Sequence, residues 1–181
     1  MRPRAARRPP HVAPREPDSA EAAYAEAVKR LARQPQSRAA LGEKLTRAGF
    51  VEEAVRVALD RAEADGYLND REYAASLVRR RAPSRGHALI AQELRARGID
   101  DSAAEPALAQ VDPDAELEGA LSIGRRLLAQ KQPADAEALV NYLAPRLARR
   151  GFTSGLAYKV CRRLAAEYEA ARLFDERSEH N

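Results

Sequence analysis

The sequence has no tryptophan, a single cysteine and few aromatic residues, and these shortages limit the classes to which it can belong. The single cysteine, Cys161, excludes an internal disulfide framework and a zinc site built from several cysteines. No apolar run approaches the roughly 18 residues that predict a membrane-spanning helix, and no secretory signal follows the N-terminus. With so few aromatic side chains, the core has to be built from leucine, valine and alanine. We therefore expect a soluble, cytoplasmic protein without a membrane segment.

Catalytic motifs are lacking as well. The three histidines lie far apart in the sequence, and no glycine-rich phosphate loop or dinucleotide-binding fingerprint is present. Asp100, Asp101, Asp112 and Asp114 could form a carboxylate or metal cluster, but acids at two helix starts explain them more simply. Cys161 lies on an apolar helix face and is interpreted as a small buried side chain. The sequence thus predicts a protein that is not an enzyme and that binds no cofactor or metal.

Alanine, arginine, leucine and glutamate are abundant, and they favour helix over strand. Apolar residues recur at helical spacing in nine segments, which group into three units of three. Units this small bury their own apolar faces poorly, so we expect them to pack on their neighbours. The prediction is an all-α fold of three tandem three-helix repeats that form an elongated, curved helical array. The predicted boundaries are residues 1–18 for a disordered Arg/Pro-rich tail, 19–69, 70–112 and 113–174 for the three repeats, and 175–181 for a frayed C-terminus.

Several residues predict where the helices begin. Ser37 is an expected N-cap, Asp70 is expected to cap the fourth helix, and Asp112 precedes a proline at the first helical position. Val51 is expected to begin the inner face of the third helix, because apolar residues follow it at intervals of four. Pro145 lies inside the eighth predicted helix and should kink or rewind it.

Each predicted repeat contains Leu-x-x-x-Gly followed by an aromatic or aliphatic residue. Glycine directly after a helix end adopts the left-handed conformation without a steric penalty, and the residue after it folds back onto the last turn. The matches therefore predict three Schellman-type helix ends. They are Leu45, Gly49 and Phe50; Leu94, Gly98 and Ile99; and Leu147, Gly151 and Phe152. A weaker fourth match is Gly66 with Tyr67, for which the earlier residue is an alanine.

Positive charge is the main functional signal, and it is unevenly distributed. The first 18 residues hold five arginines and two acids, which favours either an electrostatic arm for nucleic acid or a dispensable, solubilising extension. Residues 71–98 carry seven arginines against two glutamates, whereas residues 99–120 carry seven acids and no base. This alternation predicts basic faces on particular helices rather than a uniformly cationic protein.

Guanidinium groups at this density suit contacts with phosphates or with acidic protein surfaces. The alternative is that arginines near helix C-termini only complement the helix dipole. We interpret the run from Arg79 to Arg85 as a binding cluster and keep both possibilities for the others. The candidate binding residues are Arg79, Arg80, Arg81, Arg85, Arg95, Arg97, Arg149, Arg150, Arg162 and Arg163.

The motifs occur in a characteristic order along the chain. They are found in Ser37–Phe50, Gly66–Ala74, Arg79–Arg81, Gly86–Ile99 and Leu147–Phe152. In this order and spacing they resemble the RecX family, the regulatory proteins that act on the RecA recombinase. The resemblance covers roughly residues 20 to 170 and omits the Arg/Pro-rich tail. Departures from the family pattern are modest, such as a tyrosine at position 73 where the family commonly has phenylalanine.

The resemblance implies both a fold and a function. It implies three tandem three-helix repeats and a protein without enzymatic activity that binds the RecA–DNA filament, within its helical groove. Its partners would be RecA and single- or double-stranded DNA. Bound there, it would inhibit ATP hydrolysis, strand exchange and co-protease activity by RecA, and so modulate recombination, DNA repair and the SOS response. The family motif does not fix any residue set as the binding site.

Two other interpretations stay open from the sequence. The first is a stand-alone helical DNA-binding protein with helix-turn-helix-like units, whose binding to DNA would weaken steeply with salt even without RecA. The second is an adaptor for some other acidic partner.

Overall fold

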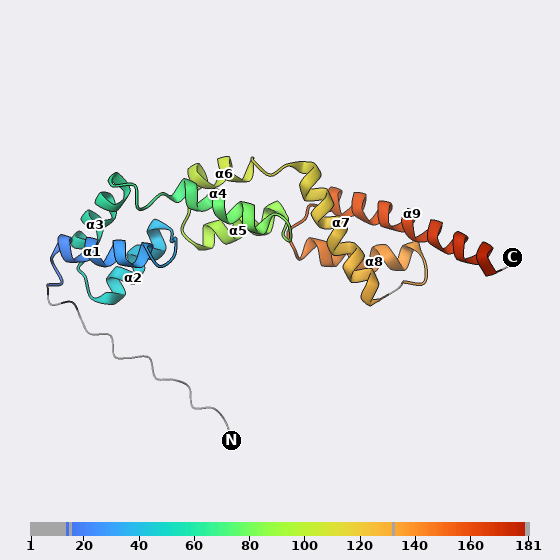
Figure 1. Ribbon diagram of the computed structural model, residues 1–181, viewed down its shortest axis with the longest axis horizontal. Coiled ribbons are helices and arrows are strands. Elements are labelled where there is room, and N and C mark those ends of the chain that lie inside the picture. Colours follow the sequence, from blue (N-terminus) through green and yellow to red (C-terminus); the bar gives the residue numbers. More distant parts are fainter. Residues whose placement is uncertain (1–13, 15, 132, 180–181) are drawn as a thin grey trace, which may run out of the picture. The chain divides into compact units, whose positions relative to one another are not determined.

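The computed structural model describes residue 14, residues 16–131 and residues 133–179, with side chains up to residue 170. In this part of the chain there are nine α-helices and no strand, which confirms the predicted all-α class (Figure 1). Most of the predicted disordered tail lies outside the described residues. The helices are α1 (Ala20–Leu31), α2 (Arg38–Ala48), α3 (Glu52–Ala64), α4 (Asp70–Arg81), α5 (His87–Ala96), α6 (Asp101–Leu108), α7 (Pro113–Gln130), α8 (Ala136–Ala148) and α9 (Ser154–Glu179).

The chain divides into two compact units, with the boundary between Tyr73 and Ala74, inside α4. The first unit contains α1–α3 and the start of α4, and the second contains the rest. This division does not test the repeat boundaries expected after residues 69 and 112, which stay predictions. At the C-terminus, α9 continues past residue 174 to Glu179, so helix extends into the segment predicted to be frayed.

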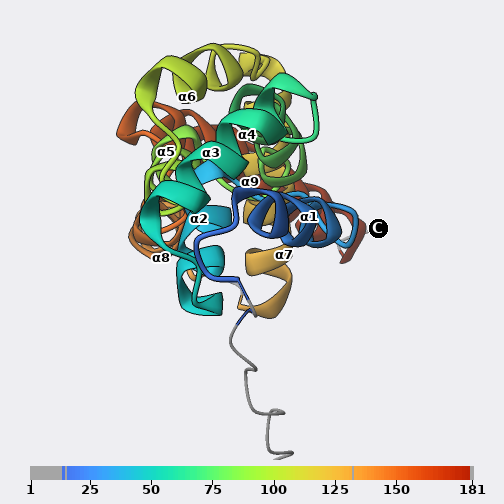
Figure 2. The ribbon, with the colours of Figure 1, turned by 90° about the vertical axis from the view of Figure 1, so that its left-hand side faces the viewer.

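In the first unit, α1, α2 and α3 pack on one another (Figures 1 and 2). Leu41 and Leu45 of α2 are fully buried, and α1 contributes Ala23 and Ala27, whose small side chains let the helices approach closely. All residues of this core lie between positions 22 and 68. The first unit therefore encloses an apolar core of its own, which the sequence analysis did not expect of so few residues.

Asp70 does not cap α4 in the predicted way. The side chain of Asn69 takes that role, because its Oδ1 accepts the N–H of Glu72 at 3.0 Å. Asp70 is the first residue of the helix, and its Oδ1 accepts the backbone N–H of Arg38 at 2.8 Å. Asp70 thus ties the start of α4 to the start of α2, two segments of the first unit that are far apart in sequence.

The predicted caps Ser37 and Asp112 are confirmed, because a side-chain oxygen of each accepts a backbone N–H at the start of α2 and α7. Side-chain oxygens of Asp100 and Thr153 accept in the same way at the start of α6 and α9. Val51 is an exception: it precedes α3 with its side chain 45% exposed, so its assignment to the inner face was wrong. Its N–H instead donates to the carbonyl of Pro17 at 2.9 Å. Pro145 lies within α8, which continues to Ala148.

All three predicted Schellman-type helix ends are confirmed. Gly49, Gly98 and Gly151 have φ of 101°, 70° and 84°, and each following N–H donates to the carbonyl of the predicted leucine at 3.1–3.3 Å. Gly66, at φ 77°, forms the fourth. There Tyr67 was the wrong choice of packing residue, since Tyr67 is exposed and the next residue, Leu68, is buried.

The second unit has a separate core between α7, α8 and α9. Leu121, Leu143, Leu147 and Val160 are fully buried in it. Cys161 lies beside them and is also buried, as predicted, and its burial raises the pKa of the thiol. This core fixes α9 against α7 and α8, and so fixes the arginines that α8 and α9 carry.

A close contact of backbone with backbone joins α5 to the end of α8 within the second unit. The N–H of Gly86 donates to the carbonyl of Arg150 at 2.8 Å, and the N–H of Ala88 donates to the carbonyl of Gly151 at 3.3 Å. The N–H of His87 donates to Oε1 of Glu116 at 3.1 Å. The first N–H groups of α5, which no side chain of its own caps, are thus satisfied by α7 and by the turn after α8.

Glycine is required at both sides of this contact. A Cβ atom on Gly86 would overlap the backbone of Gly151 and Phe152, and a Cβ atom on Gly151 would overlap Leu89. A Cβ atom on Gly119 of α7 would lie 3.1 Å from the carbonyl oxygen of Pro83, which is a tight contact rather than an overlap. Gly151 was predicted only as a helix end, and no packing role was predicted for Gly86.

Candidate functional site

All ten predicted arginines lie in the second unit, and their environments differ. Three end α4, one lies in the turn before α5, two lie at the end of α5, two follow α8, and two lie on α9. No group of three or more potential metal ligands is found among the described residues. In the described part of the chain, no helix is both long and apolar enough to cross a membrane.

Glu93 of α5 gathers three of the predicted arginines. Arg81 makes a bidentate contact, with Nε to Oε2 and Nη2 to Oε1 both at 3.0 Å. Arg85 Nη1 donates to Oε2 at 2.5 Å, and Arg97 Nη2 donates to Oε1 at 2.9 Å. We call this group the Glu93 cluster. It draws on α4, the following turn and α5, so that it also fixes the geometry of the α4–α5 connection.

The Glu93 cluster keeps a positive charge at neutral pH. The carboxylate is only 14% exposed, and its burial acts to raise the pKa of Glu93. Hydrogen bonds from Arg81 and Arg97 and the charges of Arg81 and Arg85 outweigh burial, so the pKa lies below its ordinary value. One ionised carboxylate therefore faces three guanidinium groups, so that positive charges outnumber negative ones within the cluster.

Arg79 and Arg80 differ from the neighbouring Arg81. Both are exposed at the end of α4, and neither makes an ion pair with any described residue. The structure thus divides the predicted run from Arg79 to Arg85 into two exposed cations and two cations bound to Glu93. The exposed pair is available for a partner without breaking an internal contact.

The remaining predicted arginines either contact another group of the protein or are exposed without an ion pair in the described part of the chain. Arg95 contacts Asp101 at 3.3 Å, and Arg163 contacts Glu118 at 3.4 Å. The guanidinium of Arg150 donates to the carbonyl of Arg146 at 3.3 Å. Two others, Arg149 and Arg162, are exposed and form no ion pair within the described part of the chain.

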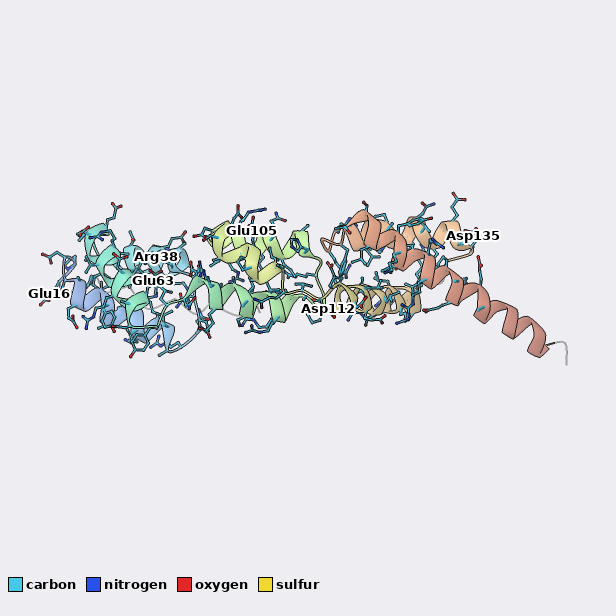
Figure 3. All side chains as sticks on the ribbon, turned by 90° about the horizontal axis from the view of Figure 1, so that it is seen from above. Glu16, Arg38, Glu63, Glu105, Asp112 and Asp135 are labelled. Atoms are coloured by element: carbon cyan, nitrogen blue, oxygen red, sulfur yellow. The ribbon has the colours of Figure 1, made fainter. Side chains whose placement is uncertain are left out.

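The first unit shows the opposite balance of charge. Arg38 contacts Asp60 at 2.5 Å and Glu63 at 2.8 Å, and Figure 3 shows the labelled Arg38 and Glu63 side by side. Arg56 likewise contacts Glu53 and Asp60. In these networks each arginine faces two carboxylates, whereas in the Glu93 cluster one carboxylate faces three arginines. Among the described residues, these networks differ in that arginines outnumber carboxylates in the Glu93 cluster of the second unit.

Glu93 was not predicted from the sequence as the residue that holds these arginines together. Arg97 follows Glu93 by four residues, at the end of α5, and this spacing could have suggested an ion pair. The contacts of Glu93 with Arg81 and Arg85 depend on how the chain turns between α4 and α5. Tyr158 and Lys159 on α9 were also missed, although they share a face with the predicted Arg162 and Arg163.

Comparison with known protein sequences identifies relatives of this chain. Two family models match it: the RecX first three-helix domain over residues 23–61 and the RecX second three-helix domain over residues 69–108. The regulatory protein RecX of Streptomyces coelicolor is 33% identical over 152 residues, covering 83% of this chain and 81% of that protein. This chain belongs to the RecX family. Another RecX, from Thermobifida fusca, is 35% identical over 137 residues, covering 75% of this chain and 74% of its own.

Solved structures of RecX proteins agree in fold. The crystal structure of a regulatory protein RecX matches with a TM-score of 0.72 and 25% identity, covering 78% of this chain and 72% of its own. RecX from Lactobacillus salivarius matches with a TM-score of 0.75 and 22% identity over 80% of this chain and 96% of its own. The family resemblance expected from the motifs is thus confirmed, and RecX is a family of regulatory proteins rather than of enzymes.

Proposed function

We propose that this RecX protein binds the RecA–DNA filament and inhibits the ATPase, strand-exchange and co-protease activities of RecA. It would thereby modulate homologous recombination, DNA repair and the SOS response in the cytoplasm, without cofactor or catalysis of its own. Membership of the RecX family supports this proposal. The observation that carries it in the structure is the pair of exposed arginines, Arg79 and Arg80, which form no ion pair with any described residue and adjoin the Glu93 cluster in the chain.

Such a protein needs no reactive group, because a ligand that binds one state of a filament shifts the population toward that state. Arg79 and Arg80 offer planar guanidinium groups that can pair with phosphates or with carboxylates. Since they make no internal ion pair in the described chain, no such pair has to be broken when a partner binds. The Glu93 cluster adds a fixed positive field at the adjoining turn.

The test removes the two exposed arginines together. The Arg79→Ala/Arg80→Ala variant is expected to bind RecA filaments on single-stranded DNA roughly tenfold or more weakly than the unaltered protein, because it loses two charge-assisted contacts. Binding would be measured by sedimentation with filaments assembled on a slowly hydrolysed ATP analogue. Helix content measured by circular dichroism should not change, since both side chains are exposed.

A matched control removes two arginines whose charges are already matched. The Arg47→Ala/Arg56→Ala variant loses exposed arginines of the first unit that pair with Glu43 and Glu53, and it should bind filaments nearly as well as the unaltered protein. An equal loss in both variants would mean that only net charge matters, and no loss in either would remove Arg79 and Arg80 from the interface.

The competing function is that of a stand-alone DNA-binding protein with helix-turn-helix-like units. It predicts tight binding to DNA without RecA, which weakens steeply with salt, and no added affinity when RecA coats the DNA. The proposed function predicts that RecA increases affinity at a fixed salt concentration.

A further inference from the structure

Four of the six tyrosines have their rings or hydroxyl groups engaged inside the protein. Arg61 lies over the ring of Tyr24 at 4.0 Å, and Arg146 lies over the ring of Tyr142 at 3.8 Å. Tyr73 is buried, and the hydroxyl of Tyr168 donates to the carbonyl of Pro133 at 2.8 Å. The other two, Tyr67 and Tyr158, are 56% and 60% exposed, with no cation over either ring among the described residues.

Tyr158 differs from Tyr67 in its surroundings. It lines a cleft of about 400 Å³ on α9 together with Lys159, Arg162, Arg163 and Ala166, and none of the described residues that line this cleft is acidic. It also lines a groove of about 560 Å³ between α8 and α9, whose walls are mostly apolar and include Val140, Pro145 and Ala157. Among the described residues, Tyr158 is the one that lines both the cleft and the groove.

Two of the cations on this face have no acidic partner among the described residues. Lys159 and Arg162 are exposed and form no ion pair within the described part of the chain. Arg163 contacts Glu118 at 3.4 Å and Glu167 at 3.8 Å, on the side toward α7. An open aromatic ring, two unpaired cations and an apolar groove therefore lie together on the α8–α9 face.

We propose that this face binds single-stranded nucleic acid, with an unpaired base stacked on the ring of Tyr158. The cations Lys159 and Arg162 hold the flanking phosphates, and the groove between α8 and α9 takes the apolar side of the base. An aromatic platform beside a cationic track is how proteins bind single strands without reading their sequence. The inference rests on the proposed function, since it assigns a site for the DNA of the filament.

The same chemistry disfavours an acidic peptide and a DNA duplex. An acidic peptide would use the cations but has no planar group that needs the open ring of Tyr158. A duplex keeps its bases stacked in its interior, so it would leave the ring without a partner unless a base were flipped out. A single strand offers both an unpaired base for the ring of Tyr158 and phosphates for the cations.

The test compares tyrosine variants of the full-length protein in binding to fluorescein-labelled oligothymidylate, measured by anisotropy without RecA. Tyr158→Ala should weaken binding by about 5- to 150-fold, the usual contribution of one stacked base. Tyr158→Phe keeps the ring and should bind like the unaltered protein. Tyr67→Ala removes an equally exposed tyrosine from the first unit and should have no effect.

An abasic oligonucleotide of the same length separates stacking from charge. On that backbone the unaltered protein and Tyr158→Ala should bind equally, because no base is left to stack. A second readout uses the absence of tryptophan: oligothymidylate should quench tyrosine emission in the unaltered protein, and Tyr158→Ala should lose most of that quenching. If Tyr158 had only a structural role, Tyr158→Ala would lose the same affinity for the abasic oligonucleotide as for oligothymidylate.

Three results would overturn the inference. They are no binding of oligothymidylate by the unaltered protein, equal binding by Tyr158→Ala, and a loss in Tyr158→Ala that is seen with oligoglutamate but not with oligothymidylate. The last would make this face a docking surface for an acidic protein segment. If the unaltered protein and Tyr158→Ala both still inhibited RecA in such a case, the proposed function would stand although the inference had failed. Failure of the inference can therefore be distinguished from failure of the proposed function.

Discussion

The Gly86→Ala variant is expected to lose about 2–6 kcal/mol of unfolding free energy in the second unit. The added methyl group would meet the backbone of Gly151 and Phe152, which cannot move aside as a side chain can, and overpacking of this kind costs about 1–3 kcal/mol. The displaced backbone would also weaken the hydrogen bonds from Gly86 and Ala88 to the turn after α8, at about 0.5–1.5 kcal/mol each. Urea denaturation followed by circular dichroism measures the loss.

Gly155 provides the matched control for this variant. It is the second residue of α9, also in the second unit, and a Cβ atom there meets nothing within 4 Å. Gly155→Ala should therefore be neutral or stabilise the protein by up to about 1 kcal/mol, as alanine favours helix. If both variants lost the same stability, the contact between α5 and the turn after α8 would not hold the second unit together.

The Leu94→Ala variant is expected to lose about 2–5 kcal/mol, the usual cost of a cavity left by a deleted leucine. Leu94 is fully buried, and its carbonyl accepts the N–H of Ile99 at the end of α5. Leu94→Met roughly conserves volume and should cost less than about 1.5 kcal/mol. Thermal and urea denaturation of the two variants measure the difference. A loss below 1 kcal/mol in Leu94→Ala would show that this position is not part of a packed core.

Local features of the fold could be read from the sequence. A Schellman helix end needs one glycine and two residues near it, so the ends at Gly49, Gly98 and Gly151 were predictable from short windows. The same holds for caps such as Ser37 and Asp100, whose hydrogen bonds span three residues. Where two adjacent residues could both cap, as at Asn69 and Asp70, tertiary structure decided, because Asp70 is engaged by the backbone of Arg38.

Features that join distant segments could not be predicted. The overlap that forbids a side chain at Gly86 depends on a turn that follows α8, far along the chain. Likewise, the sequence indicated a basic region but not which of its arginines are exposed and which are bound to Glu93. Glu93 reaches Arg81 and Arg85 only across the turn between α4 and α5. The open ring of Tyr158 was missed because helical periodicity does not say which tyrosine is covered by a cation.

The most direct test of the account is the single-stranded-DNA-dependent ATPase of RecA, titrated with this protein from substoichiometric to equimolar ratios. The account predicts inhibition, and inhibition well below one molecule per RecA protomer would further favour filament end capping or disassembly. An unchanged ATPase at equimolar protein, together with salt-sensitive binding to DNA alone, would contradict regulation of RecA and favour a DNA-binding protein in its own right.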